Sequence, residues 1–184
     1  MIRSKSAMTW GMAAGVCVLL SASSAWADKE IHTKVGPWSI DSMVVAQTGV
    51  MRRGDDDKTG GRPYCGMLRQ GDNSSLQILL SPAKLIEFYV ASSQFKVSKG
   101  QKYSVTVSVG PRKLKAESDD VYVVNDTSLL LMGFEMNPLL NELRGAKEVV
   151  VEGAGQKFTF AMDGAVDASK AMEKCVSDLF GWWN

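Results

Sequence analysis

The sequence is poor in the residues on which most enzymatic sites depend. It contains one histidine and three cysteines among its 184 residues. The histidine, His32, lies close to the expected start of the mature chain, in a segment that we expect to be poorly ordered. A Ser-His-Asp or Cys-His site would have to be built on it, and zinc normally takes several ligands from Cys and His. We therefore expect no zinc site, no cofactor and no catalysis by histidine.

The chain also lacks an excess of charge of either sign. Its 21 basic and 20 acidic residues give a formal net charge of +1. Surfaces that bind nucleic acid or anionic lipid usually carry a clear basic excess. This balance predicts a partner other than nucleic acid.

Only one long apolar run is present, and it lies at the N-terminus, over Met8 to Leu20. Two basic residues precede this run, and the small-x-small pattern of residues 25–27 follows it, which together are typical of a cleavable bacterial-type signal peptide. A spanning helix needs roughly 20 consecutive apolar residues. We therefore predict a signal peptide at residues 1–27, a single mature domain at 28–184 in the periplasm or outside the cell, and no transmembrane segment after cleavage.

The number of cysteines available to form a disulfide falls once the signal peptide is removed. Cys17 leaves with it, and only Cys65 and Cys175 remain in the mature chain. Two cysteines in an oxidising compartment most simply form one disulfide, which here would close most of the domain into a loop. A free thiol or an intermolecular pair is the alternative.

Strand patterns dominate the mature chain. Residues 103–109 alternate apolar and polar side chains and are rich in valine, which is the clearest strand signal. Turn residues separate further apolar segments, and residues 112–120 read as a charged connection. The expected strands are 38–40, 43–51, 64–70, 76–80, 85–90, 103–109, 121–124, 147–152 and 157–162.

Two helices are expected near the C-terminus. Asn137 and Pro138 are a plausible N-cap and first helical residue of a short helix that ends at Gly145. After Gly164, apolar residues recur every three or four positions and include Cys175, which predicts an amphipathic helix. The fold class is therefore α+β, mainly antiparallel β, as a sandwich or a partly open barrel with two short C-terminal helices.

Two segments are candidate partner-binding surfaces. The first is the polar, glycine-rich stretch 52–63, which we expect to be a mobile surface loop; calcium binding by its aspartates is the less favoured alternative, because consecutive acids do not follow a calcium-loop spacing. The second is the C-terminal tail, whose adjacent tryptophans cannot easily both be buried; a tail that folds back over the sheet is the alternative. The residues concerned are Arg52, Arg53, Asp55, Asp56, Asp57, Trp182 and Trp183.

A pair of carboxylates is the remaining kind of catalytic site that the sequence could supply. Glycoside hydrolysis needs two of them about 5 to 9 Å apart in a cleft. Nothing in the spacing of the acids selects such a pair. The candidates are Asp41, Glu87, Glu117, Asp119, Asp120, Glu135 and Glu142.

Three segments together resemble a known bacterial family. They are Trp38-Ser39-Ile40, the segment from Cys65 to Gln70, and the segment from Phe158 to Gly164 that leads into the last helix. In these the chain is similar to the invasion-associated locus B proteins, although it lacks the further cysteines that members of that family commonly carry. The resemblance implies a small exported β-rich domain with a C-terminal helix and a role in host-cell invasion or the cell envelope, and it implies no catalytic residue.

These observations favour a non-enzymatic interaction protein of the envelope or of the secreted fraction. Its partner would be a protein of the envelope or of a host, bound by the strand edges, the 52–63 loop or the tryptophan tail. An inhibitor of an extracellular enzyme such as a lysozyme or a protease is the alternative, and a carboxylate hydrolase is the third.

Overall fold

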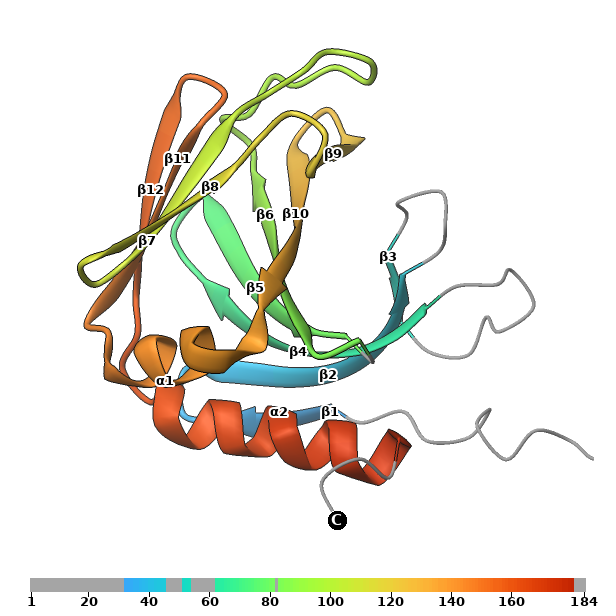
Figure 1. Ribbon diagram of the computed structural model, residues 1–184, viewed down its shortest axis with the longest axis vertical. Coiled ribbons are helices and arrows are strands. Elements are labelled where there is room, and N and C mark those ends of the chain that lie inside the picture. The colour runs from blue at the N-terminus through green and yellow to red at the C-terminus, as the bar shows by residue number, and fades with distance from the viewer. Residues whose placement is uncertain (1–31, 46–50, 54–61, 82, 181–184) are drawn as a thin grey trace, which may run out of the picture.

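The structure, a computed structural model, describes residues 32–45, 51–53, 62–81 and 83–180. In these residues, two antiparallel sheets face each other, and two helices pack below them (Figure 1). The mainly antiparallel α+β class predicted from the sequence is therefore confirmed. Neither sheet closes into a barrel within the described part of the chain.

The larger sheet has eight strands: seven in the order β1-β2-β4-β5-β6-β10-β9, and β3, which pairs with the C-terminal end of β2. All of its pairings are antiparallel, mostly between strands that follow each other in the chain. Its strands are β1 (His32–Val35), β2 (Trp38–Val45), β3 (Met51–Arg53), β4 (Arg62–Gln70), β5 (Ser74–Leu80), β6 (Leu85–Ser92), β9 (Val121–Asn125) and β10 (Ser128–Glu135).

The smaller sheet has four strands in the order β12-β11-β7-β8. It is built from two hairpins, β7 (Val105–Val109) with β8 (Arg112–Ala116) and β11 (Glu148–Gly153) with β12 (Gln156–Ala161), joined through β7 and β11. The alternation read from residues 103–109 is confirmed, because the three valines of β7 are buried and the residues between them are half-buried.

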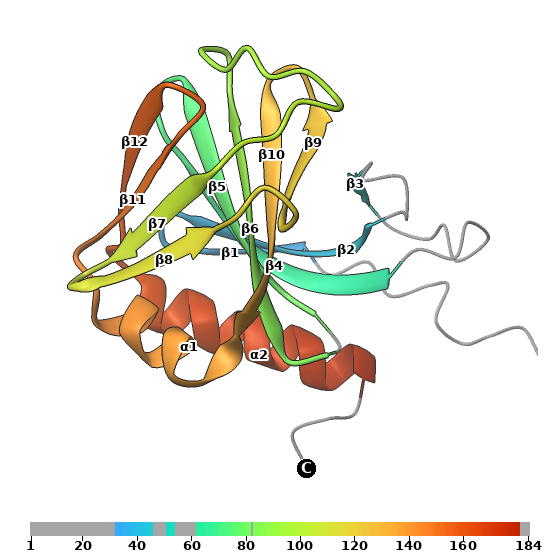
Figure 2. The same cartoon turned by 45° about the horizontal axis from the view of Figure 1, so that its top comes forward.

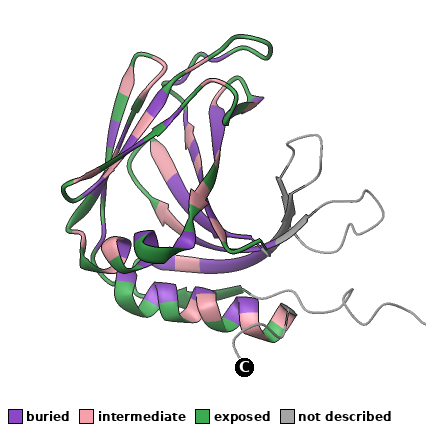
Figure 3. Ribbon diagram, in the orientation of Figure 1, coloured by how far each residue is buried: buried purple, intermediate pink, exposed green. Residues whose placement is uncertain are grey.

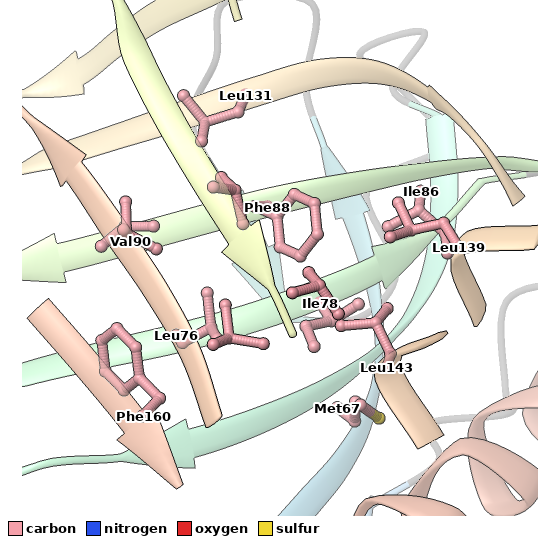
Figure 4. Packing of buried hydrophobic residues seen from close by; sticks show 14 of the residues in the cluster. Met67, Leu76, Ile78, Ile86, Phe88, Val90, Leu131, Leu139, Leu143 and Phe160 are labelled. Atoms are coloured by element: carbon pink, nitrogen blue, oxygen red, sulfur yellow. The ribbon is translucent and has the colours of Figure 1, made fainter. Parts of the chain in front are cut away.

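The main core lies between the two sheets. Apolar residues of β5, β6 and β10 face those of the smaller sheet, as Figure 4 shows for Leu76, Phe88 and Phe160. Phe95 and Phe158 meet edge to face, with ring centroids 5.0 Å apart. In the smaller sheet buried positions alternate with exposed or half-buried ones, whereas β5, β6 and β10 of the larger sheet contain runs of consecutive buried residues (Figure 3).

The helices close the lower end of this core. In α1 (Met136–Gly145), Asn137 has extended backbone angles (φ −99°, ψ 125°), so the regular turns start at Pro138, as predicted. Helix α2 (Ala165–Phe180) packs against β2 and β4 and contacts α1. Cys175 of α2 and Cys65 of β4 form a disulfide with a Cα–Cα separation of 6.0 Å. The predicted staple between the last helix and the strand at residue 64 is therefore confirmed.

Three expectations about local structure were wrong. His32 is the first residue of β1, and its imidazole pairs with the carboxylate of Asp41, so the segment is held by β-pairing. Residues 112–116, read as part of a charged connection, form edge strand β8, because Leu114 and Ala116 are buried while its lysines stay in solvent.

The predicted loop 52–63 is also shorter than expected at both ends. Arg52 and Arg53 belong to β3, and residues 62 and 63 begin β4. The strand over residues 128–135 was not predicted, although its run of three leucines is buried in the structure.

Candidate functional site

Of the predicted partner-binding residues, the structure describes only Arg52 and Arg53. Arg52 and Arg53 lie in β3, opposite Val44 and Met43 of β2. The other residues of that prediction, Asp55, Asp56, Asp57, Trp182 and Trp183, lie outside the described residues, so their role stays a prediction.

The two most buried candidate carboxylates are each engaged by a local neighbour. Asp41 pairs with His32, and Glu87, which is 2% exposed, accepts a hydrogen bond of 3.0 Å from the Tyr64 hydroxyl. By register, Asp41 and Glu87 lie in one row across β2, β4, β5 and β6, three strand spacings apart, or about 14 Å along the sheet. Among the described residues, no three His, Cys, Asp or Glu side chains are grouped as a metal site would need.

A more distinctive feature is the outer edge of β12. In the smaller sheet β12 pairs only with β11, as Figure 2 shows, and its other side faces away from the sheet. Ala154 and Gly155, which join the two strands, both have positive φ (51° and 73°), the geometry of a two-residue type I′ turn.

This turn determines which backbone groups of β12 are used. The residues that flank a two-residue turn form a hydrogen-bonded pair, and such pairs then alternate with pairs that exchange no hydrogen bond. Phe158 and Phe160 therefore bond to β11, and the bond of 2.9 Å from the Met162 N–H to the Lys147 carbonyl follows the same alternation. The N–H and C=O groups of Lys157, Thr159 and Ala161 point away from β11.

A groove of about 400 Å³ runs beside this edge. One wall is β12, from Lys157 to Ala161, and the other is the end of β4, the turn into β5 and Gln94. The second wall supplies amide, hydroxyl and charged groups: Arg69, Gln70, Asp72, Asn73, Ser74 and Gln94. The groove is therefore lined by hydrogen-bonding groups along the open edge of a sheet.

The groove rests on a set of fixed contacts below it. The Arg69 guanidinium donates to the Asp163 carboxylate at 2.8 Å and lies 5.8 Å from the centroid of the Trp38 ring. The Trp38 indole N–H in turn donates to the Asp163 backbone carbonyl at 2.8 Å. Because Trp38 is fully buried, these contacts tie β2 and β4 to the turn that follows β12. The two walls are thus held to a common base.

The opposite edge of the smaller sheet differs in chemistry. By the same alternation, the outward backbone groups of β8 belong to Lys113 and Lys115, both exposed. Lysines on an edge strand discourage pairing with another chain. Along β12 the outward positions are Lys157, Thr159 and Ala161, so only one of three carries a charge.

A second groove, of about 280 Å³, lies at the end of the smaller sheet nearest α1. It is lined by short segments of β7, β11 and the chain that leaves α1, with Lys147 and Glu148 as its charged residues. It lies along no free strand edge of the described chain, so β12 remains the stronger candidate.

Comparison with known proteins adds no relative: the chain matches no protein-family model, no curated protein and no solved structure. Among the described residues, no helix has the length and apolar character needed to cross a membrane.

Sequence reasoning placed the strand at 157–162 but not the groove beside it. The alternation of Phe158 and Phe160 with polar residues signals a half-buried strand, and the short glycine-containing turn signals a hairpin. Neither signal says that β12 ends the sheet, because that depends on pairing between β7 and β11, which are distant in the sequence. The groove therefore had no local signature.

Proposed function

We propose that this protein is an exported, non-enzymatic interaction protein that binds another protein through the groove beside β12. The observation that carries the proposal is the open backbone edge at Lys157, Thr159 and Ala161, which faces a groove lined by amide and hydroxyl groups. An exposed edge with unpaired N–H and C=O groups is a template for pairing with another chain, and proteins usually protect such edges. The lysines of β8 illustrate that protection, and β12 has less of it.

The proposed location is the periplasm or the space outside the cell. The signal-peptide pattern of residues 1–27 supports it, since it combines basic residues, an apolar run and a small-x-small site. The disulfide between Cys65 and Cys175 supports it as well, because such bonds persist in oxidising compartments.

The proposed class is that of the invasion-associated locus B proteins. Its support is the similarity of Trp38-Ser39-Ile40, Cys65 to Gln70 and Phe158 to Gly164 to segments of that family. Trp38 and Arg69 contact Asp163, so residues from all three of these segments meet at the base of the groove.

Site-specific photo-crosslinking in the cells that make the protein tests the function. A photoreactive amino acid is placed at Thr159 in one variant and at Lys113, on the other edge of the same sheet, in a second. We expect a discrete protein adduct from position 159 and none from position 113. Adducts of equal yield at both positions, or at neither, would count against the groove as the binding surface.

A further inference from the structure

The groove, which we call the slot, lies along a single strand edge. Its walls, β12 and the β4–β5 turn, belong to different sheets, and the base contacts of Arg69 and Trp38 hold them in place. A second copy of this protein would have to bring a whole sheet edge into the slot. An extended segment of a partner needs only the width of one strand, about 4.8 Å from β12.

The backbone of β12 matches such a segment. Lys157, Thr159 and Ala161 present N–H and C=O groups at every second residue, which is the spacing that an added strand satisfies. No bond from these backbone groups to another described residue is present outside the sheet pairings. A partner strand would form hydrogen bonds with these N–H and C=O groups, and its main chain would supply most of the recognition.

One side chain at the slot also favours a particular residue in the partner. Lys157 is exposed on the outer face of β12, opposite Glu152 of β11 in register, and makes no ion pair within 4 Å with any described residue, whereas the charge of Arg69 is paired with Asp163. Opposite charges in directly facing positions of neighbouring strands attract each other. An acidic residue of an added strand would face Lys157 from the side of β12 opposite Glu152.

We propose that the partner contributes an extended peptide that adds to β12 as a fifth strand of the smaller sheet, with an acidic residue beside Lys157. This inference rests on the proposed function, because it gives the mode of binding at the same groove. It excludes a folded partner bound only by side chains, a glycan held by the amides of the groove, and a second copy of this chain.

A proline substitution tests the role of the backbone. Thr159→Pro removes an N–H that points away from β11, so the hairpin keeps its internal bonds. Lys113→Pro does the same on β8 and is the matched control. Peptides are first selected from a phage-displayed library of random dodecapeptides on the unmodified, disulfide-intact domain. We expect the selected peptides to carry a recurrent Asp or Glu, to bind Thr159→Pro about tenfold or more weakly, and to bind Lys113→Pro unchanged.

Residue-resolved amide exchange on the unmodified protein gives a readout that does not depend on the folding of a variant. Adding a selected peptide should slow exchange at Lys157, Thr159 and Ala161 and leave Phe158 and Phe160, already bonded to β11, unchanged. A different outcome would overturn strand addition while retaining the groove as a binding site. In that outcome the peptide binds and Asn73→Arg in the other wall abolishes the binding, but the three amides stay in fast exchange. A library from which no peptide is enriched, or dimerisation in place of peptide binding, would overturn the inference as well.

Discussion

At the scale of single residues, Arg69 connects the groove to the rest of the fold. Its side chain is 16% exposed, lies against Trp38 and donates to Asp163, which follows β12 in the chain. The cluster explains how a charged residue is accommodated near the end of β4. Its guanidinium is paired with the Asp163 carboxylate where the strand leaves the core. The cluster could not be deduced from the sequence, because Arg69 and Asp163 are 94 residues apart.

Asp163→Asn should lower the free energy of unfolding by about 1 to 2 kcal/mol, because Arg69 loses a charged hydrogen-bond acceptor while remaining largely buried. Chemical denaturation of the disulfide-intact domain measures this. Lys102→Met is the control, since it removes an ion pair between two exposed side chains. Lys102 lowers the pKa of the Asp119 carboxyl through a hydrogen bond and its charge, but solvent screens that pair, and its loss should leave stability unchanged. Equal effects of the two variants would contradict this account of Arg69.

Gly153 allows close approach of β11 to β7. A Cβ at this position would lie 2.7 Å from the Val105 side chain and 3.0 Å from the Ser104 carbonyl oxygen. Gly153→Ala should therefore cost about 1 to 3 kcal/mol of stability, because backbone atoms would have to move. Gly145→Ala is the matched control, since a Cβ added there, at the end of α1, would meet no atom within 4 Å. Denaturation midpoints that are the same for both variants would show that the hairpin tolerates the extra methyl group.

At the scale of elements, periodicity predicted most strands, including the edge strands β9 and β12, but missed β1 and β8 at sheet edges and β10 inside the larger sheet. β7 and the β11–β12 hairpin have regular alternation and clear turns, and both were found. β1 and β8 are short and carry polar or charged residues, because an edge strand exposes more of its surface. The candidate site was missed for another reason, because the edge position of β12 follows from the pairing of β7 with β11.

The disulfide is the main covalent link between α2 and the larger sheet. Cys65 and Cys175 are 110 residues apart, and a loop of that length gives at most about 4 to 5 kcal/mol by the chain-entropy model, with measured values usually lower. We expect Cys65→Ala/Cys175→Ala to lose about 2 to 4 kcal/mol of stability, and reductant to destabilise the unmodified domain but not the variant. Unchanged stability of the double variant in denaturant would refute a structural role for the bond.

At the scale of the whole molecule, the strand and helix patterns predicted the mainly antiparallel class, and the two sheets with α2 pinned beneath them agree with it. The larger sheet brings β1 and β9, which are far apart in the chain, to its opposite ends. Such long-range pairing order leaves no periodic trace in the sequence. The same holds for the meeting of Arg69, Trp38 and Asp163.

Export is a property of the whole chain and has a direct test. Cell fractionation followed by N-terminal sequencing should find the protein in the periplasm or the medium, beginning at Asp28. Ala27→Pro should block cleavage and leave the longer chain attached to the membrane fraction. A cytoplasmic protein that retains residues 1–27 would refute the signal-peptide prediction.

The central claim, that this protein acts by binding a partner through the groove beside β12, is tested most directly by its native size in the fractions to which it is exported. Three forms are compared on native gels: the unmodified protein, Thr159→Trp, which adds a bulky ring to the edge that lines the groove, and Lys113→Trp, which adds the same ring to the opposite edge. The account predicts that the unmodified protein and Lys113→Trp migrate in a complex, and that Thr159→Trp migrates as a monomer. A complex of unchanged size with Thr159→Trp, or no complex for the unmodified protein, would contradict it.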